Sequence, residues 1–554
     1  MLRLHPSTID YVIIAIYFAV VLGIGFVARL SIKTDLDFFL SGRSLPAWIT
    51  GLAFIAANLG ALEILGQSAN GAQYGVPAVH YYWIGAVPAM VFLGLVMMPF
   101  YYGAKVRSVP EYVRLRFNEP AHAFNAVTFA IATVLISGVN LFALALIIHL
   151  LLGWPVGGSI LIAAAIVLVY ITLGGLTSAI YNEVLQFFII CAALIPLTLV
   201  GLHSVGGWSG LENRIKHFTK LGNPGLHAWH GLSIHHPTNP LMSSWIGLVF
   251  GLGFVLSFGY WTTNFAEVQR ALSARNLSAS KRTPLIGAYP KIFLPFIIIL
   301  PGLIAVVTVH GLGVGKSLSL QYNTAIPHLI GQFFPDGMLG IAIVGLLAAF
   351  MAGVAANVTA FNTVVTYDLI QSYVWKDRDP AFYLRWGRLV TVGGILVSIA
   401  TAFIAKGYSN IMNYIQTLFS IFNAPLFATF IVAMFWKRAT AWGGFWSLVA
   451  GTATAYAVNR LAAYHTIFHF GSALSASFYQ AIWAFVAGAV VLVLVSLVTK
   501  PKPVEELEGL VWGLTRKEER EVNADPRDRL WWRSPALLGG VAIALVVILN
   551  IIFI

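Results

Sequence analysis

Long runs of apolar residues recur along nearly the whole chain and are separated by shorter polar stretches. A helix needs roughly 20 residues to cross the hydrocarbon core of a bilayer, so each run predicts one membrane span. An even number of spans places both chain ends on the same side. We expect fourteen spans, near residues 11–30, 46–74, 78–103, 123–152, 156–175, 179–201, 242–266, 285–310, 338–372, 387–405, 408–436, 439–463, 476–499 and 535–554.

Composition supports this interpretation. Of 554 residues, 58% are hydrophobic and only 10% are charged, against about 25% charged in soluble domains. The chain is therefore expected to form a single all-α polytopic membrane domain, 1–554, with the lipid bilayer as its surroundings and no nucleic-acid partner. One cysteine, Cys191, excludes an intramolecular disulfide. The first span, 11–30, lacks a small-residue cleavage site and is predicted to be retained.

Basic residues orient the spans. With the N-terminus outside, 25 of the lysines and arginines fall in inside loops and seven fall outside. Positive charge concentrates on the cytoplasmic side, so we expect both termini outside a cell inner (plasma) membrane. Residues 500–534 then form a charged cytoplasmic loop before the last span, 535–554.

The second span carries polar residues and glycines where a lipid-facing helix would not. Asn58, Gly60, Glu63 and Gln67 lie near its middle. A carboxylate at mid-bilayer costs about 2.5–3.5 kcal/mol, and glycine weakens a helix. The pattern predicts an unwound segment near Asn58–Gly66 that faces an aqueous cavity. The alternative is a glycine-rich packing face with a protonated Glu63.

The seventh span has a similar density of glycine and polar residues, which predicts a second break near Ser257–Thr263. Five spans separate the two breaks. Transporters with inverted repeats place discontinuous helices at equivalent positions of their two halves and bind solute between them. We therefore expect repeats at 46–201 and 242–436, followed by two further spans within 439–499.

One cation lies inside the eighth span. Lys291, between Pro290 and Pro295, is costly there unless it is paired or snorkels to the inner surface. The two interpretations, a role in the cavity and a snorkelling anchor, remain open on the sequence alone.

Six motifs occur in order along roughly residues 10–500. They are Gly42-Arg43-Ser44-Leu45-Pro46, Ser108-Val109-Pro110-Glu111-Tyr112, Leu173-Gly174-Gly175-Leu176-Thr177-Ser178-Ala179, Gln269-Arg270-Ala271-Leu272-Ser273-Ala274, Lys291 through Pro301-Gly302, and Phe435-Trp436-Lys437-Arg438. With them the sequence resembles the sodium/solute symporter family, and within it the sodium/sugar cotransporter-like branch. The resemblance implies a LeuT-like core of two inverted five-helix repeats and transport by alternating access.

The resemblance implies three solute contacts directly. Tyr260 matches the family's tyrosine gate, Lys291 its site lysine, and Gln416 its glutamine in the eleventh span. The sugar members' adjacent Glu-Gln falls on Leu62-Glu63, so the carboxylate is displaced by one position. Half of the sugar-bonding set is absent, which leaves the solute undefined. Together with Gln67, the expected substrate-binding residues are Glu63, Gln67, Tyr82, Ser257, Tyr260, Lys291 and Gln416, with Tyr82 where the family has a glutamate and Ser257 where it has an asparagine.

The resemblance also implies a sodium site. It would use the carbonyls of Ala56, Leu59 and Ala349 and two hydroxyls, but the hydroxyl positions fall on Ala352 and Gly353, which have none. A hard cation takes about six oxygen ligands. We therefore expect weak dependence on sodium, with a proton on Glu63 as the substitute, since burial favours a neutral carboxyl.

The sequence thus predicts a secondary transporter that moves a small polar organic solute, sugar-like or related, with a coupling cation. No cofactor is expected. One alternative is an uncoupled facilitator or a substrate sensor on the same fold. An intramembrane enzyme is the other, and no nucleophile or metal constellation supports it. Oligomeric state and stoichiometry do not follow from the sequence.

Overall fold

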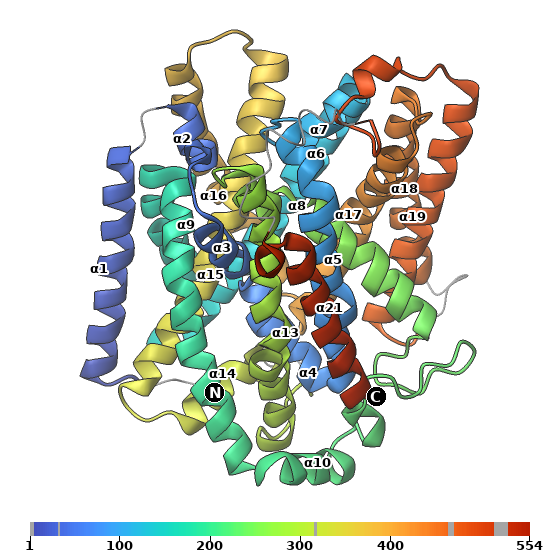
Figure 1. Cartoon of the computed structure of the whole chain (residues 1–554). Coiled ribbons are helices and arrows are strands. Elements are labelled where there is room, and N and C mark those ends of the chain that lie inside the picture. The colour runs from blue at the N-terminus through green and yellow to red at the C-terminus, as the bar shows by residue number, and fades with distance from the viewer. Residues whose placement is uncertain (1–4, 32–33, 315–317, 464–469, 515–529) are drawn as a thin grey trace.

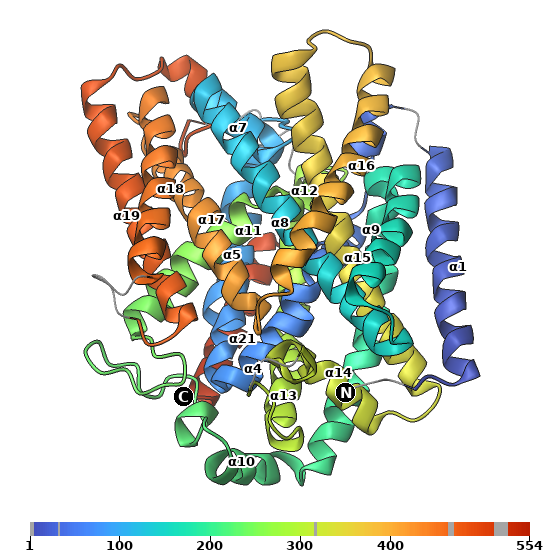
Figure 2. The ribbon, with the colours of Figure 1, turned by 180° about the vertical axis from the view of Figure 1, so that it is seen from behind.

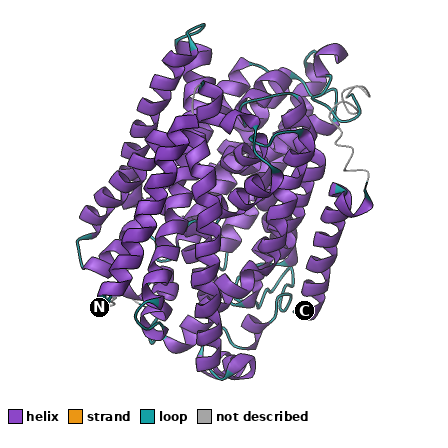
Figure 3. Ribbon diagram, turned by 60° about the vertical axis from the view of Figure 1, so that its left-hand side comes forward, coloured by secondary structure: helices purple, strands orange, loops and turns teal. Residues whose placement is uncertain are grey.

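The computed structural model describes residues 5–31, 34–314, 318–463, 470–514 and 530–554. Over these ranges the chain is helical with connecting loops, and none of it forms a strand (Figure 3). Part of the predicted cytoplasmic loop, residues 515–529, lies outside the described residues. The predicted all-helical membrane architecture is confirmed.

Each of the fourteen predicted stretches coincides with helical structure. Ten helices are long and apolar enough to cross a membrane, and two bent pairs bring the number to twelve among the described residues. The two remaining stretches are also helical, but one is short and the other is less apolar. They are Val156–Val169, the first part of a longer helix, and Ala441–Ala463.

The first half of the chain supplies the first broken helix and its surroundings. Its helices are α1 (Thr8–Ser31), α2 (Asp35–Leu40), α3 (Ala47–Asn58), α4 (Ser68–Tyr74), α5 (Val87–Phe92), α6 (Met98–Gly103), α7 (Val109–Arg116), α8 (Glu119–Leu152), α9 (Val156–Ser204) and α10 (Gly207–Phe218). Short π-helical turns at Leu62–Gln67, Tyr81–Ala86 and Leu93–Met97 connect several of them.

The second half supplies the other broken helix and the peripheral spans. A π-helical stretch, Gly247–Ser257, runs directly into α11, and another, Val364–Val374, continues α15. The helices are α11 (Phe258–Thr263), α12 (Phe265–Leu272), α13 (Leu277–Thr308), α14 (Ala325–Phe333), α15 (Met338–Thr363), α16 (Pro380–Ala405), α17 (Ile411–Phe435), α18 (Ala441–Ala463), α19 (Ala473–Val498) and α21 (Pro535–Ile552).

Helices α8 and α15 occupy the middle of the bundle. In each, 89% of the most apolar segment is buried inside the protein, against 22% for α1 and 17% for α21. In Figure 1, α1 stands at the left edge of the bundle and α21 lies across its front. Since α1 and α21 bury so little within the chain, most of their apolar surface is available to lipid.

Helix α9 is long because it joins two predicted spans. It is interrupted at Gly175, which has φ of +53°. A Cβ at this position would come within 2.6 Å of the Phe38 ring. Glycine is therefore required both for the backbone conformation and for the contact, and the break separates the predicted spans 156–175 and 179–201.

The segments before α3 and after α12 meet in a small backbone bridge. Leu45 N–H donates to the Ser273 carbonyl over 3.3 Å, and Arg275 N–H donates to the Leu45 carbonyl over 2.9 Å. The start of α1 and the end of α21 lie at the same end of the bundle, as an even number of spans requires (Figures 1 and 2).

Candidate functional site

The first predicted break is confirmed in position but is shorter than the predicted stretch Asn58–Gly66, because Leu62–Gln67 are wound as a π-helix. Helix α3 ends at Asn58, the backbone leaves helical conformation at Leu59, and the helix that resumes at Leu62 is bent by 57°. Gly60 lies at the bend, where a Cβ would come within 2.4 Å of the Asn140 side chain. Glycine is therefore needed at the point where α8 approaches the bend.

Asn140 of α8 stabilises this break. The first N–H groups of a helix lack an intrahelical partner, and Asn140 Oδ1 accepts from the N–H of Ala61 over 2.8 Å. Its Nδ2 donates to the Ile136 carbonyl of its own helix over 3.1 Å. Asn140 is only 1% exposed, so a buried amide from a neighbouring helix holds the start of the second half-helix.

The second break lies at Asn264, one residue beyond the predicted stretch Ser257–Thr263. Helices α11 and α12 are bent there by 49°. Asn264 has extended backbone, and its side chain accepts from Ala266 N–H over 3.1 Å as an N-cap. The glycine-rich stretch before it stays wound, as a π-helix, and the polar cap rather than the glycines marks the interruption.

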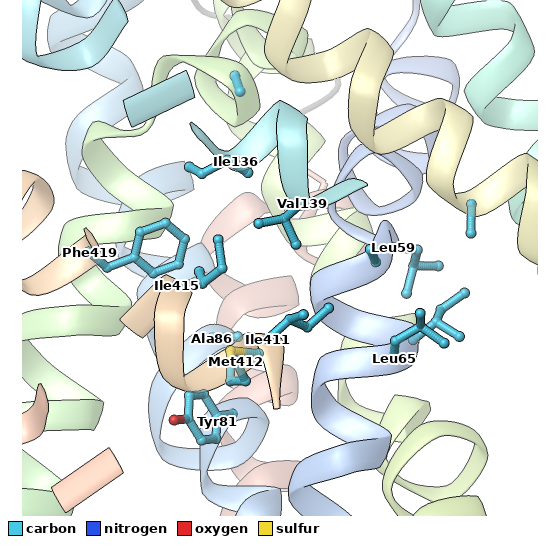
Figure 4. Close-up of a cluster of buried hydrophobic side chains, with 14 of the residues drawn as sticks. Leu59, Leu65, Tyr81, Ala86, Ile136, Val139, Ile411, Met412, Ile415 and Phe419 are labelled. Carbon is cyan, nitrogen blue, oxygen red and sulfur yellow. The ribbon is translucent and has the colours of Figure 1, made fainter. Parts of the chain in front are cut away.

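A cavity lies between the two broken helices and α17. It encloses about 50 Å³, enough for a few water molecules but well below the ~300–1,000 Å³ of pockets that hold drug-sized ligands. Its walls are Asn58, Leu62, Glu63, Gln67, Tyr81, Ala86, Leu252, Leu256, Ser257, Tyr260, Trp261, Met412, Gln416 and Phe419. Figure 4 shows Tyr81, Met412 and Phe419 of this wall among their apolar neighbours.

A buried ion pair lies beside the cavity. The Lys291 ammonium of α13 forms a buried salt bridge with the Glu63 carboxylate and donates to Asn58 Oδ1 over 2.5 Å. Tyr82 donates its hydroxyl to the other oxygen of Glu63 over 2.6 Å. Lys291 is 1% exposed and lies over the rings of Tyr82 and Trp261 at 4.7 and 5.2 Å. The snorkelling interpretation is therefore wrong, and the lysine points into the core.

The same network continues to the second broken helix. Asn58 Nδ2 donates to the Tyr260 hydroxyl over 3.1 Å, and that hydroxyl donates to Glu267 Oε1 over 2.7 Å. One chain of polar contacts thus joins α3, α11, α12 and α13. Because Asn58, Glu63 and Tyr260 also line the cavity, any group that binds there meets this network.

Five of the seven predicted solute contacts lie on the cavity wall, namely Glu63, Gln67, Ser257, Tyr260 and Gln416. The other two, Tyr82 and Lys291, lie behind the wall and act on it through Glu63. Gln416 Oε1 has no hydrogen-bond partner among the described residues although it is buried. Ser257 packs against Gly85, where a Cβ would come within 2.3 Å of the serine oxygen.

Sequence reasoning missed the wall residue Tyr81, whose buried hydroxyl has no partner among the described residues. It also missed Glu267 and the bracing residue Asn140. Tyr81 directly precedes a residue that the resemblance picked out, and Asn140 is an amide inside an apolar span. Those were the signals available for these two residues.

The predicted sodium ligands do not make a complete cation site. Ala56, Leu59, Ala349 and Ala352 are fully buried, and Gly353 approaches Gly60 at the break. The Ala56 carbonyl already accepts from Leu59 N–H over 3.0 Å. The nearest amide, Asn140, is engaged with Ala61, and its Oδ1 would lie 2.1 Å from a Cβ on Gly353. A hard cation that needs about six oxygens is not matched by this arrangement.

A second buried ion pair holds the helices around the site. Arg270 of α12 forms a salt bridge with Glu183 of α9, both at most 1% exposed, and also donates to the Ala266 carbonyl over 2.7 Å. Removing one member of a buried pair is strongly destabilising. This pair therefore ties α12, the second part of the second broken helix, to α9.

Sodium/glucose cotransporters are among the known proteins that are similar to this chain in sequence. The model of the Sodium:solute symporter family matches residues 38–451. The chain is 30% identical to sheep (Ovis aries) "Sodium/glucose cotransporter 1" over 94% of this chain and 83% of that protein, and 30% identical to human (Homo sapiens) "Sodium/glucose cotransporter 4" over 92% and 78%. It is 27% identical to the Vibrio parahaemolyticus "Sodium/glucose cotransporter" over 80% and 84%.

Solved structures share the fold. A Na⁺-coupled sialic acid symporter, in a substrate-bound outward-open state, aligns with a TM-score of 0.73 at 18% identity, covering 89% of this chain and 99% of that one. Mhp1, a nucleobase-cation-symport-1 family transporter in a closed conformation, aligns with a TM-score of 0.51 at 13% identity, covering 87% and 97%. These likenesses show the LeuT-like fold.

Proposed function

The chain belongs to the sodium:solute symporter family and is a multi-pass membrane transporter rather than an enzyme, and from this premise we propose that it carries a small polar organic solute, sugar-like or related, together with a cation. The observation that carries the proposal is the cavity between the two broken helices. Its wall contains apolar side chains and polar groups without hydrogen-bond partners among the described residues, and it lies where such folds bind their solute.

The cavity offers hydrogen bonds without net charge. Gln416 Oε1 and the Tyr81 hydroxyl have no protein partner among the described residues, while Glu63 is neutralised by Lys291. Aromatic and aliphatic side chains form the rest of the wall. These groups suit an uncharged solute with several hydroxyls or amides. They offer an anion no unpaired positive charge, because Lys291 lies behind the wall and is paired with Glu63.

Solute binding requires the site to expand. A volume of about 50 Å³ holds water but not a sugar-sized molecule, so the cavity in this conformation is smaller than the proposed solute. We propose that 46–201 and 242–436 are the two inverted repeats and that their relative movement enlarges the cavity. The predicted orientation, with both termini outside the inner membrane, remains part of the proposal.

An uncoupled facilitator or substrate sensor is the second candidate. It is favoured by one observation, the absence of side-chain hydroxyls at Ala352 and Gly353, which leaves a sodium ion with too few ligands beside the first break. Such a protein would bind the same solute but would not concentrate it.

Two measurements test the proposal. Thermal unfolding of the purified protein with D-glucose, D-galactose, neutral amino acids and carboxylates, each in sodium and in choline buffer, identifies the solute class. Uptake of radiolabelled D-glucose into proteoliposomes under a sodium gradient, a pH gradient or neither then separates symport from facilitated passage. Stabilisation by carboxylates alone, with no effect of sugars or amino acids, would contradict the proposed solute class.

A further inference from the structure

The buried ionisable groups around the two broken helices do not balance. Three carboxyl groups, on Glu63, Glu183 and Glu267, lie there with two cations, Lys291 and Arg270. Lys291 pairs with Glu63, and Arg270 pairs with Glu183. Glu267 is left without a cation of its own.

The contacts of Glu267 leave a negative charge on it largely uncompensated. The residue is 2% exposed. Its Oε1 accepts from the Tyr260 hydroxyl over 2.7 Å, and its Oε2 is buried with no hydrogen-bond partner among the described residues. A buried carboxylate is strongly disfavoured when one of its oxygens has no hydrogen-bond partner. A proton on that oxygen removes the charge.

The surroundings contain little to stabilise an ionised Glu267. Helices α3 and α15 pack against α12 and carry no ionisable side chain. Tyr101 and Tyr102 of α6 donate to the backbone carbonyls of Thr262 and Ala274. Asp37 of α2 accepts from the N–H of Thr34.

Three charged groups act on Glu267 from a distance. They are Arg270 on the same helix, Glu183 on α9 and Lys291 on α13. The side-chain N–H groups of Arg270 donate to Glu183, Ala266 and Gln269, and Lys291 donates to Glu63 and Asn58. The N-terminal dipole of α12 favours a negative charge only modestly. None of these groups forms a hydrogen bond with Glu267 Oε2.

We propose that Glu267 is a proton-binding site of this transporter, protonated in the conformation described here and titrated during the transport cycle. The proposal deepens the proposed function, on which it rests, by naming the cation as a proton and its carrier as Glu267. Protonation forms one O–H bond on Oε2 with a proton from water entering from one side of the membrane, and deprotonation returns that proton to water on the other side. No redox partner is involved.

Glu63, the carboxyl that the sequence suggested for this role, is less suited to it. Its two oxygens are bound by Lys291 and Tyr82, so neither is left without a partner. Both oxygens of Glu183 are likewise bound by Arg270. Of these three buried carboxyl groups, only Glu267 has an oxygen without a hydrogen-bond partner, and only Glu267 has no paired cation.

Tyr260 connects the proton site to the solute cavity. Its hydroxyl donates to Glu267 and accepts from Asn58, and its side chain lines the cavity. A solute that binds Tyr260 or Asn58 therefore changes the hydrogen bonding of Glu267. By thermodynamic reciprocity, protonation of Glu267 changes solute affinity by the same factor.

Infrared difference spectroscopy of the purified full-length protein, recorded as pH is raised, tests the site without any solute. The wild type should show at neutral pH the carbonyl stretch of a protonated carboxylic acid, which disappears at higher pH. The stretch should be lost in Glu267→Gln and retained in Glu212→Gln, which removes an exposed carboxylate on α10. It should shift in Tyr260→Phe, which removes the hydrogen bond to Oε1.

A wild type without this stretch at neutral pH would overturn the proposal without reference to any variant, as would a stretch unchanged in Glu267→Gln. In proteoliposomes, an inward pH gradient should accelerate D-glucose uptake by the wild type, and Glu267→Gln should lose this acceleration while still exchanging D-glucose. Equal acceleration in both overturns the coupling role. No D-glucose uptake by either contradicts the sugar assignment alone, because the infrared result stands independently.

Discussion

The side chain of Asn140 on α8 occupies the space that any side chain on Gly353 of α15 would need. A Cβ on Gly353 would lie 2.1 Å from Asn140 Oδ1, closer than atoms can approach. The family resemblance expects a serine hydroxyl at position 353, and in this chain the amide of Asn140 lies where that side chain would be. The amide holds the broken α3–α4 segment through Ala61.

Gly353→Ser alone should therefore destabilise the protein. The added side chain must displace a buried amide that already has two hydrogen-bond partners, and overpacking of this kind costs about 1–3 kcal/mol. Thermal unfolding in detergent measures the loss. Gly393→Ser on α16 is the control, since nothing lies within 4 Å of its Cβ position. Equal stability of the two variants would contradict the described contact.

Lys291→Met should destabilise the protein strongly because it leaves Glu63 buried and unpaired. Breaking a buried ion pair by removal of one partner costs about 3–5 kcal/mol. The double variant Lys291→Met/Glu63→Gln removes both charges and should recover part of the loss. A double-mutant cycle from unfolding midpoints checks this, and strictly additive effects would show that the two side chains do not interact.

Gln416→Ala should weaken solute binding and change stability little, because Gln416 Oε1 has no partner among the described residues and Nε2 donates only to the weak acceptor Met412 Sδ. One hydrogen bond contributes about 0.5–1.5 kcal/mol net, which corresponds to roughly 2–10-fold in affinity. Concentration-dependent thermal stabilisation by the solute measures the change. Gln480→Ala on α19, also buried with an unpaired amide atom, should keep wild-type affinity. If Gln416→Ala also kept wild-type affinity, Gln416 would not contact solute.

Arg116→Met should loosen the attachment of α7 to the end of α17. Arg116 donates to the carbonyls of Ala433, Trp436 and Ala439 over 3.0–3.2 Å. Burial lowers its pKa to about 10, so it remains charged at neutral pH and complements the helix C-terminus.

Each unpaired buried carbonyl costs about 1–3 kcal/mol, so the unfolding midpoint of Arg116→Met should fall clearly. The neighbouring Arg114, an exposed side chain paired with Glu119, gives the matched control. Arg114→Met should lose at most about 1 kcal/mol. A midpoint for Arg116→Met as high as that of Arg114→Met would contradict the role of the buried guanidinium.

Much of the fold was predictable because apolar run length determines where a helix can cross a membrane. The first break was predictable because Gly60, Glu63 and Gln67 interrupt an apolar run at its middle. The second was displaced to Asn264 because the glycines before it pack as a π-helix against neighbouring helices. Only a three-dimensional arrangement decides whether a glycine unwinds a helix or lets another helix approach.

The candidate site was predictable only in part. Tyr260 and Gln416 carried a family resemblance and lie on the cavity wall. Asn140 and Glu267 carried no such signal. Asn140 is one amide in an apolar span, and Glu267 follows the predicted end of the seventh span, where a carboxylate is ordinary. Their importance arises from partners 79 and 7 residues away, which local sequence patterns do not specify.

The bridge between Leu45 and Ala274 has a consequence for movement. It joins the chain just before the first broken helix to the chain just after the second through two backbone hydrogen bonds. In the proposed movement we expect the two half-helices nearest this bridge to move together. A passage that opens beside them would then form along their outer border rather than between them. Cross-linking residues 45 and 274 should consequently leave the alternation between the two membrane faces intact.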